Sequence, residues 1–219
     1  MPQLIAMIIV VVGAMIYMFQ TFGGTGDKIE GIAQKTSVIT EINNIKNGLQ
    51  LAVRDGQVTN DGTTVTVLTD LANLQYFANQ INDELANNTV AGNANTNTNA
   101  YSAISFGGED NPGMLLNLVT SSTAATATTI TQRPGIRVVL EGELAGNAGF
   151  LEAQITNDLA AVASIDRTTT TGAAVTLDVN GDVPAANRAA AQGGSATGAT
   201  LEDGIFTIYF KDMPANVQQ

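Results

Sequence analysis

The side chains on which most enzyme and metal chemistry depends are missing from this chain, which has no Cys, no His and no Trp. A thiolate nucleophile, an imidazole base, a Ser-His-Asp triad, a disulfide framework and an ordinary zinc site are therefore excluded. Two pairs of neighbouring carboxylates remain for acid–base chemistry: Glu141 with Glu143, and Glu202 with Asp203. Such chemistry needs two carboxylates in different environments. Neither pair has a basic residue or a cleft nearby that would make the environments of its two carboxylates differ. We interpret both pairs as solvated surface charges and expect no enzymatic activity.

Oxygen ligands for a cation occur in one suggestive run, from Asp178 to Asp182, where they stand at alternate positions as in the first part of a calcium loop. The twelfth position counted from Asp178 is Ala189, so the acidic residue that completes an EF-hand is missing. Asn180-Gly181 is also a standard turn signal, and a plain turn is the preferred interpretation. The acidic run from Glu109 to Asn111 is interpreted as a solvated loop. We therefore expect no metal and no cofactor.

The charge balance bears on possible partners. Nine Lys and Arg stand against 20 Asp and Glu, which gives a formal net charge of -11. This charge opposes non-specific binding to nucleic acid and to anionic lipid. Several of the basic residues are scattered along the chain: Arg133, Arg137, Arg167 and Arg188. Only 13% of the residues are charged, against about 25% in an average soluble domain, and a neutral polar surface of this kind is typical of exported proteins.

The N-terminal segment is the most distinctive element. No charged residue occurs before Asp27, and residues 4–19 are apolar apart from one small glycine. At about 1.5 Å per residue, an uncharged helix over residues 2–22 is roughly 30 Å long, which matches the hydrocarbon core of a bilayer. A signal peptide is disfavoured because Met1-Pro2-Gln3 carries no basic side chain. A buried core helix is disfavoured because the segment is apolar on every face. The pattern predicts a helix that can cross a membrane.

A second helical segment of different character follows this run. Glycines first loosen the chain at Gly23, Gly24 and Gly26. From Ile29 to Val53 the apolar residues then recur at i, i+3 and i+4, and Asp55-Gly56 gives a helix stop. These features predict a rod whose first half lies in lipid or in an oligomeric core and whose second half lies on a globular head. A glycine-rich linker between an anchor and an independent domain is the plain alternative.

The rest of the chain reads as short strands and helices separated by turn signals. Strands are predicted over residues 63–68, 102–106, 115–120, 126–131, 136–140, 173–179 and 204–210. Helices are predicted over residues 69–85, with Thr69 as cap, and over residues 149–162, with a cap near Asn147. Residues 87–100 and 184–199 are predicted loops. The expected fold class is α+β: a long N-terminal hydrophobic α-helix, then a globular head with an antiparallel β-sheet and additional helices. We expect the N-terminal helix over residues 1–56, with residues 1–26 as its apolar anchor and 27–56 as its amphipathic half, and the head over residues 57–219.

This succession of an uncharged aliphatic helix, a loosened stretch, an amphipathic continuation and a sheet-containing head resembles the type IV pilins. The spacing of elements in the head is similar to that of the larger type IVb pilins, and residues 204–210 (GIFTIYF) would be the last strand of such a head. Members usually carry Glu at mature position 5, where this chain has Ile5, and many close the head with a C-terminal disulfide, which a chain without Cys lacks. Members are also cut from a leader, so Met1 is expected to begin either a mature chain or a divergent member.

The resemblance implies a structural subunit that polymerises through its N-terminal helix into an extracellular type IV pilus-like filament. Its partners would be identical subunits, the membrane before assembly, and a pilus assembly machinery. Its location would be the cell surface, reached from a membrane-anchored precursor. The helix residues expected to mediate membrane insertion and assembly are Leu4, Ile5, Ile8, Val12, Gly13, Ile16 and Phe19. The expected hinge residues are Gly23, Gly24 and Gly26.

Two other functions fit the same features. One is a monomeric, membrane-anchored surface module that binds a partner through its Thr- and Asn-rich loops. The other is an archaeal-type pilin or flagellin with the same apolar helix but an all-β head.

Overall fold

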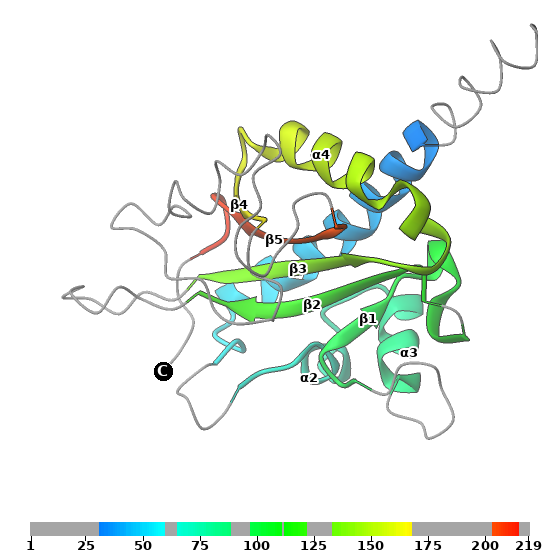
Figure 1. Ribbon diagram of the computed structural model, residues 1–219. Helices are drawn as coiled ribbons and strands as arrows, with labels where there is room; N and C mark the ends of the chain where they lie inside the picture. The colour runs from blue at the N-terminus through cyan, green and yellow to red at the C-terminus, as the bar shows by residue number, and fades with distance from the viewer. Residues whose placement is uncertain are drawn as a thin grey trace, which may run out of the picture.

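The protein has an α+β fold with a five-stranded antiparallel sheet and several helices (Figure 1). This computed structural model describes residues 31–59, 65–88, 97–110, 112–121, 133–167 and 203–214. The predicted α+β class, with an antiparallel sheet and additional helices, is confirmed, and the helices in the head exclude the all-β alternative. The long hydrophobic helix that was predicted before it falls outside the described residues over positions 1–30. The strands predicted over residues 126–131 and 173–179 and the loop over 184–199 lie outside the described residues.

The N-terminal helix covers residues 31–54 of the described chain, in agreement with the amphipathic segment predicted to reach Asp55-Gly56. Gly56 has a φ of 70°, which L residues rarely adopt. Its N–H donates to the carbonyl of Val53 (3.1 Å), and the N–H of Gln57 donates to that of Ala52 (2.9 Å). These two bonds satisfy the last carbonyls of the helix in a Schellman motif. Within the described residues, no helix has both the length and the apolar character needed to span a bilayer.

The helix predicted over residues 69–85 is wrong as one element, because the structure has two helices there: α2 (Leu68–Asn73) and α3 (Asn79–Asn87). Between them Gln75 has a φ of 61°, and the N–H of Tyr76 donates to the carbonyl of Leu71 (3.2 Å). The chain therefore uses the same kind of helix cap as at Gly56, but with a glutamine in the left-handed position. A glutamine gives no stop signal in the sequence, which explains the missed break.

The start of α2 also differs from the prediction. Val67 caps the helix, and its N–H donates to the carboxylate of Asp70 (3.0 Å). Thr69, the predicted cap, instead donates its hydroxyl to the carbonyl of Thr98 (2.7 Å). The strand predicted over residues 63–68 is wrong at its end, because Leu68 already belongs to α2.

The first strands only partly follow the predicted ranges. β1 (Ala100–Ser102) begins earlier than the predicted strand over 102–106, whose remainder forms the 3-10 helix η1 (Ile104–Phe106). A second 3-10 turn, η2 (Gly108–Asp110), follows. β2 (Met114–Thr120) and β3 (Pro134–Leu140) confirm the strands predicted over 115–120 and 136–140. Alternate residues of β2 are buried, as expected for a strand with one face on the core.

The remaining elements complete the sheet. After η3 (Gly142–Asn147), α4 (Ala148–Leu159) confirms the third helix, although it ends three residues before the predicted Val162. Asn147 stands at the N-cap position, but its side chain makes no capping hydrogen bond. β4 (Ala163–Asp166) was not predicted, and β5 (Ile205–Phe210) confirms the last strand. The strand order is β1-β2-β3-β5-β4, so β5 pairs with both β3 and β4.

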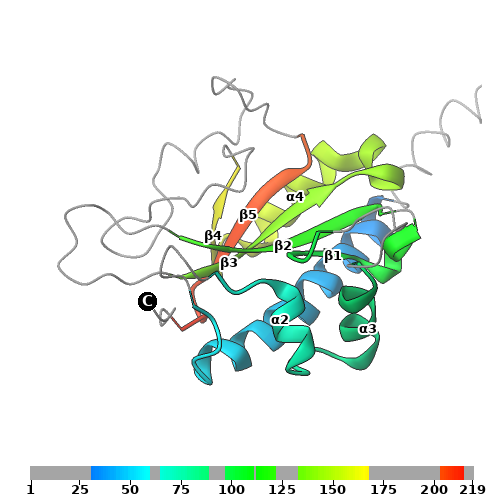
Figure 2. The same ribbon diagram turned by 90° about the horizontal axis from the view of Figure 1, so that it is seen from below.

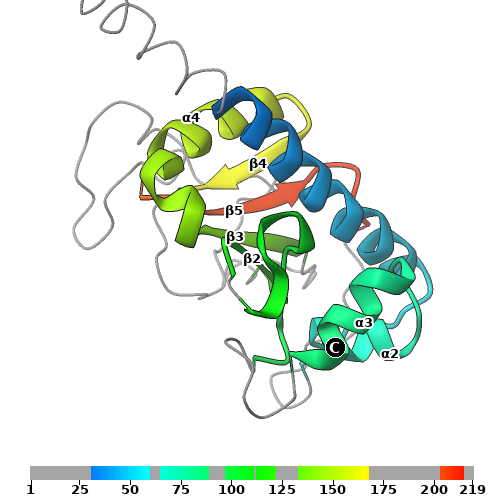
Figure 3. The same cartoon turned by 90° about the vertical axis from the view of Figure 1, so that its right-hand side faces the viewer.

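One hydrophobic core joins the N-terminal helix to the head. The helix runs along the sheet, with α2 and α3 beside its C-terminal part and α4 beside its first described turns (Figures 2 and 3). Its core residues are Val38, Ile42, Ile45, Leu49, Ala52 and Val53. They share the cluster with inward residues of paired strands, such as Leu116, Val138 and Phe206. The amphipathic half of the rod is therefore part of the folded head.

Candidate functional site

The N-terminal helix is held in the head by a buried carboxylate, that of Glu41, which is only 4% exposed. One oxygen accepts a hydrogen bond from the hydroxyl of Tyr101 in β1 (2.9 Å). The other accepts from the N–H of Ser105 in η1 (3.1 Å) and from its hydroxyl. We call this set the helix anchor: Glu41, Tyr101 and Ser105. It joins the middle of the helix to the start of the sheet by polar contacts as well as by apolar packing.

Tyr101 acts as the donor in the helix anchor. Burial raises the pKa of its hydroxyl, and the nearby charge of Glu41 raises this pKa further. The phenol therefore stays protonated and can donate to the carboxylate at every physiological pH. A buried carboxylate with three donors is the arrangement in which a charge is tolerated inside a protein.

A hollow of about 410 Å³ lies next to the helix anchor, between the N-terminal helix, the turn joining α2 to α3, and η1. The helix approaches that turn closely at Gly48, where an added Cβ would lie 2.3 Å from the ring of Phe77 and 2.7 Å from the carbonyl oxygen of Tyr76. Two apolar side chains on its rim are exposed, Leu51 at 52% and Ile104 at 42%. This surface is open to a second molecule.

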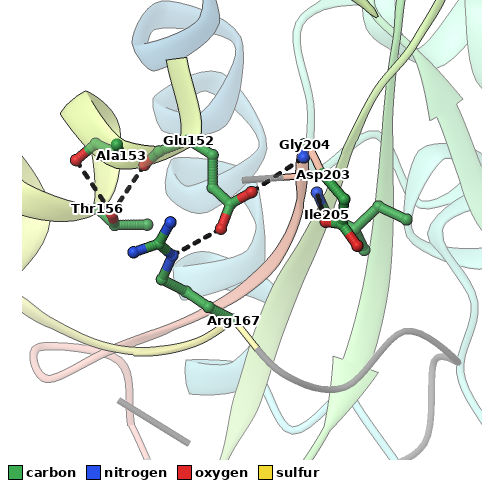
Figure 4. A network of polar contacts seen from close by, with 7 residues as sticks. All are labelled: Glu152, Ala153, Thr156, Arg167, Asp203, Gly204 and Ile205. Carbon is green, nitrogen blue, oxygen red and sulfur yellow. Dashed lines mark hydrogen bonds and ion pairs between the residues drawn. The ribbon is translucent and has the colours of Figure 1, made fainter. Parts of the chain in front are cut away.

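A second buried polar centre connects α4 to the far edge of the sheet (Figure 4). Glu152 is fully buried, and its two oxygens accept hydrogen bonds from Nε of Arg167 (2.6 Å) and from the N–H of Gly204 (2.9 Å). Burial raises the pKa of Glu152, while Arg167 and the Gly204 N–H act in the opposite direction. Glu152 therefore joins α4 to Arg167, at the end of β4, and to Gly204, which precedes β5.

Two exposed ion pairs add to the attachment of the N-terminal helix. Lys35 pairs with Asp158 of α4 (2.8 Å), and Lys46 pairs with Asp212 after β5 (2.7 Å). Burial raises the pKa of Asp212, but the ammonium of Lys46 outweighs this effect and holds the pKa below its ordinary value. Such exposed pairs contribute little to stability, so the core and the buried carboxylates dominate the attachment.

The residues predicted to form the membrane and assembly helix lie outside the described part of the chain: Leu4, Ile5, Ile8, Val12, Gly13, Ile16 and Phe19. The same holds for the hinge residues Gly23, Gly24 and Gly26, and for the run from Asp178 to Asp182. The structure therefore neither places nor groups these residues.

The carboxylate pairs considered for acid–base chemistry are only partly described. Glu141 directly follows β3 at the N-cap position of η3 and is half-buried, while Glu143 lies exposed in η3. Asp203 accepts a hydrogen bond from the N–H of Ile205 (2.9 Å), and Glu202 lies outside the described residues. Among the described residues, no group of three acidic residues is placed to hold a metal ion.

The buried carboxylates of Glu41 and Glu152 were missed by the sequence reasoning, although a signal exists for each. Glu41 stands next to Ile42 on the apolar stripe of its helix, and Glu152 stands next to Leu151 on that of α4. A charged residue on a core-facing stripe must find a partner, because an unpaired buried charge is very costly. Arg167, interpreted as one of several scattered cations, is one such partner.

Comparisons of the chain with protein-family models, with curated proteins and with solved structures gave no match. The functional assignment therefore depends on the residues and on the geometry.

Proposed function

We propose that this protein is the structural subunit of an extracellular type IV pilus-like filament and has no enzymatic role. The observation that carries the proposal is the amphipathic helix of residues 31–54, whose apolar side belongs to the core of an α+β head. Farther towards the N-terminus, residues 4–19 are apolar and no charged residue occurs before Asp27. A head fixed to one end of such a helix can be carried by that helix from a membrane into a polymer.

The assembly step is supported by solvent physics. A helix satisfies its own backbone hydrogen bonds, so the apolar segment can remain in a bilayer as a membrane-anchored precursor. In the filament the same segment would pack among identical helices, exchanging one apolar environment for another. Close packing must then supply the gain in free energy, and the small Gly13 would allow neighbouring helices to approach. Residues from Leu4 to Phe19 would form the filament core.

The head must withstand this transfer without disulfides, since the chain has no Cys. Its described part offers another means of attachment, because Glu41 binds Tyr101, 60 residues later, and Glu152 binds the N–H of Gly204, 52 residues later. The glycines between residues 23 and 26 would form a hinge that allows the head to adjust relative to the filament core. The partners required are identical subunits and an assembly machinery that extracts the precursor from the membrane.

Negative-stain electron microscopy of material sheared from producing cells tests the proposal, with peptide mass spectrometry on the same fraction. We expect thin, regular filaments composed of this protein. The Val12→Asp and Ile16→Asp variants should give no filaments, because a carboxylate in the filament core is not tolerated. Val12→Leu, which keeps the site apolar, should assemble as the wild type does. Wild-type filament yield from either Asp variant would refute the proposal.

A monomeric, membrane-anchored binding module is the second candidate. The observation that favours it is the hollow beside the helix anchor, with its exposed Leu51 and Ile104. Protein that remains in the membrane fraction of cells without filaments, and that stays monomeric in detergent, would support this function over the first.

A further inference from the structure

A pocket of about 250 Å³ lies where the last turn of α4 meets β4 and the residues after β5. Its exposed rim includes Asn157 and Lys211, while Thr156, Ser164 and Arg167 in its lining are buried. We call it the Arg167 pocket. Buried polar side chains beneath exposed ones are the arrangement of a small polar binding site.

Arg167 is only 6% exposed, and its guanidinium is incompletely bonded. Its Nε donates to Glu152 (2.6 Å), but within the described residues its buried Nη2 has no hydrogen-bond partner. The two terminal nitrogens point away from Glu152 toward the side of Thr156, which also lines the pocket (Figure 4). A buried donor on a cation is rarely left without an acceptor, so the pocket is suited to receive one.

The charges around the pocket indicate what kind of acceptor fits. Arg167 and Lys211 contribute two positive charges to the lining, and Glu152, which is bonded to Arg167, contributes one negative charge. The carboxylate of Asp203 acts on Glu152, and the buried Asp166 precedes Arg167 in the chain. Two other acids are already paired, Asp158 with Lys35 and Asp212 with Lys46. Among the described residues no carboxylate forms an ion pair with Lys211. The ammonium of Lys211 can therefore pair with an anion in the pocket.

A carboxylate matches this site better than a phosphate does. It carries one negative charge, and its two oxygens can take one N–H from a guanidinium and one from an ammonium. A doubly charged phosphate would interact more unfavourably than a singly charged carboxylate with the C-terminal end of α4, where the helix dipole disfavours anions.

We propose that the Arg167 pocket binds a carboxylate group, with Nη2 of Arg167 and the ammonium of Lys211 as its cationic ligands and the amide of Asn157 at its rim. The carboxylate comes either from a small free acid or from an Asp or Glu side chain of a second copy of this chain, which has 20 such residues. Only the second source depends on the proposed filament.

Side-chain NMR of the full-length protein in a nonionic detergent tests the binding. The chain has five Arg residues, so labelling arginine with ¹⁵N gives a simple Nε–H spectrum. The Nε–H of Arg167 is buried in its bond to Glu152, so its proton should exchange slowly and remain visible. The signal that disappears in Arg167→Lys assigns it. At constant ionic strength, titration with sodium acetate in place of sodium chloride should shift this signal saturably and leave the other four almost unchanged.

A matched pair of variants separates the pocket from general charge effects. Lys211→Gln should weaken acetate binding about two- to fivefold, the effect expected of one exposed charge. Arg54→Gln removes the same charge from an exposed residue outside the pocket lining and should leave the affinity unchanged. No saturable shift, an equal shift of all arginine signals, an unaffected Lys211→Gln, or tighter binding of inorganic phosphate than of acetate would each overturn the proposal.

Filament yield then identifies the source of the carboxylate. If a neighbouring subunit supplies it, Lys211→Gln should lower the yield of sheared filaments relative to Arg54→Gln. If a free acid supplies it, the two variants should assemble equally while differing in acetate binding. An absence of wild-type filaments would refute the proposed function without affecting the acetate titration, so the two failures can be told apart.

Discussion

The contribution of the helix anchor to the stability of the protein can be measured through the energetic coupling of Glu41 to each of its two donors. Glu41 accepts hydrogen bonds from Tyr101, which is fully buried, and from Ser105, which is exposed. A hydrogen bond to a charged group contributes about 1.5–3 kcal/mol, and a buried donor left without a partner costs about 1–3 kcal/mol. Ser105 can turn to water when the carboxylate is removed, whereas Tyr101 cannot. The energetic coupling of Glu41 to Tyr101 should therefore exceed its coupling to Ser105.

Two double-mutant cycles give these couplings. We expect about 1.5–3 kcal/mol between Glu41→Ala and Tyr101→Phe, and less than about 1 kcal/mol between Glu41→Ala and Ser105→Ala. The single variant Glu41→Ala should lower the free energy of unfolding by about 2–4 kcal/mol, because it removes the partner of Tyr101 and leaves a small cavity. The Ser105 cycle is the internal control, since it involves the same carboxylate.

Urea unfolding of the full-length chain in a nonionic detergent is a suitable assay, followed by the near-ultraviolet circular dichroism of its tyrosines. Tyr101→Phe reduces the amplitude of this signal but leaves the midpoint interpretable. A Glu41–Tyr101 coupling below about 0.5 kcal/mol would refute the reasoning, because independent sites already add to within that range. So would a Glu41–Ser105 coupling equal to or larger than the Glu41–Tyr101 coupling.

Two further predictions concern the same helix. Gly48→Ala should destabilise the protein by about 1–3 kcal/mol, because the new Cβ meets the ring of Phe77 and a backbone carbonyl; Gly146→Ala, with nothing within 4 Å, should change the urea midpoint little. Stability should also fall above about pH 10 by up to about 1.4 kcal/mol per pH unit, because the raised pKa of Tyr101 makes the folded state keep a proton that the unfolded state loses. Tyr101→Phe should remove this part of the decline, and an identical pH profile in the variant would contradict the assignment.

Elements with strong local signals were predictable from the sequence. The amphipathic helix ends at Gly56 because only glycine adopts a φ of 70° easily, and that residue is visible in the sequence. The strands β2, β3 and β5 follow from runs of branched and aromatic residues. The break between α2 and α3 was not predictable, because Gln75 takes the left-handed conformation under tertiary contacts.

The candidate site was less accessible to sequence reasoning than the fold. β4 has four residues and no alternation of exposed and buried positions, so its membership of the sheet comes from pairing with β5, about 40 residues later in the chain. The partnership of Glu152 with Arg167 likewise depends on where β4 ends relative to α4. The sequence shows that a carboxylate on an apolar stripe needs a partner, but only the three-dimensional arrangement shows which residue it is.

The buried carboxylates of Glu41 and Glu152 also bear on how the proposed filament subunit would keep one geometry. Apolar contacts are not directional, and a helix on a sheet can rotate or slide at modest cost if volumes are conserved. A shift of the N-terminal helix by one residue would rotate Glu41 by about 100° and would leave the hydroxyl of Tyr101 buried without its acceptor. Glu152 fixes α4 in the same way against β4 and Gly204. The proposed helical polymer would require every subunit to present its head at the same angle to its helix, and in that proposal these centres would serve to specify the angle as well as to add stability.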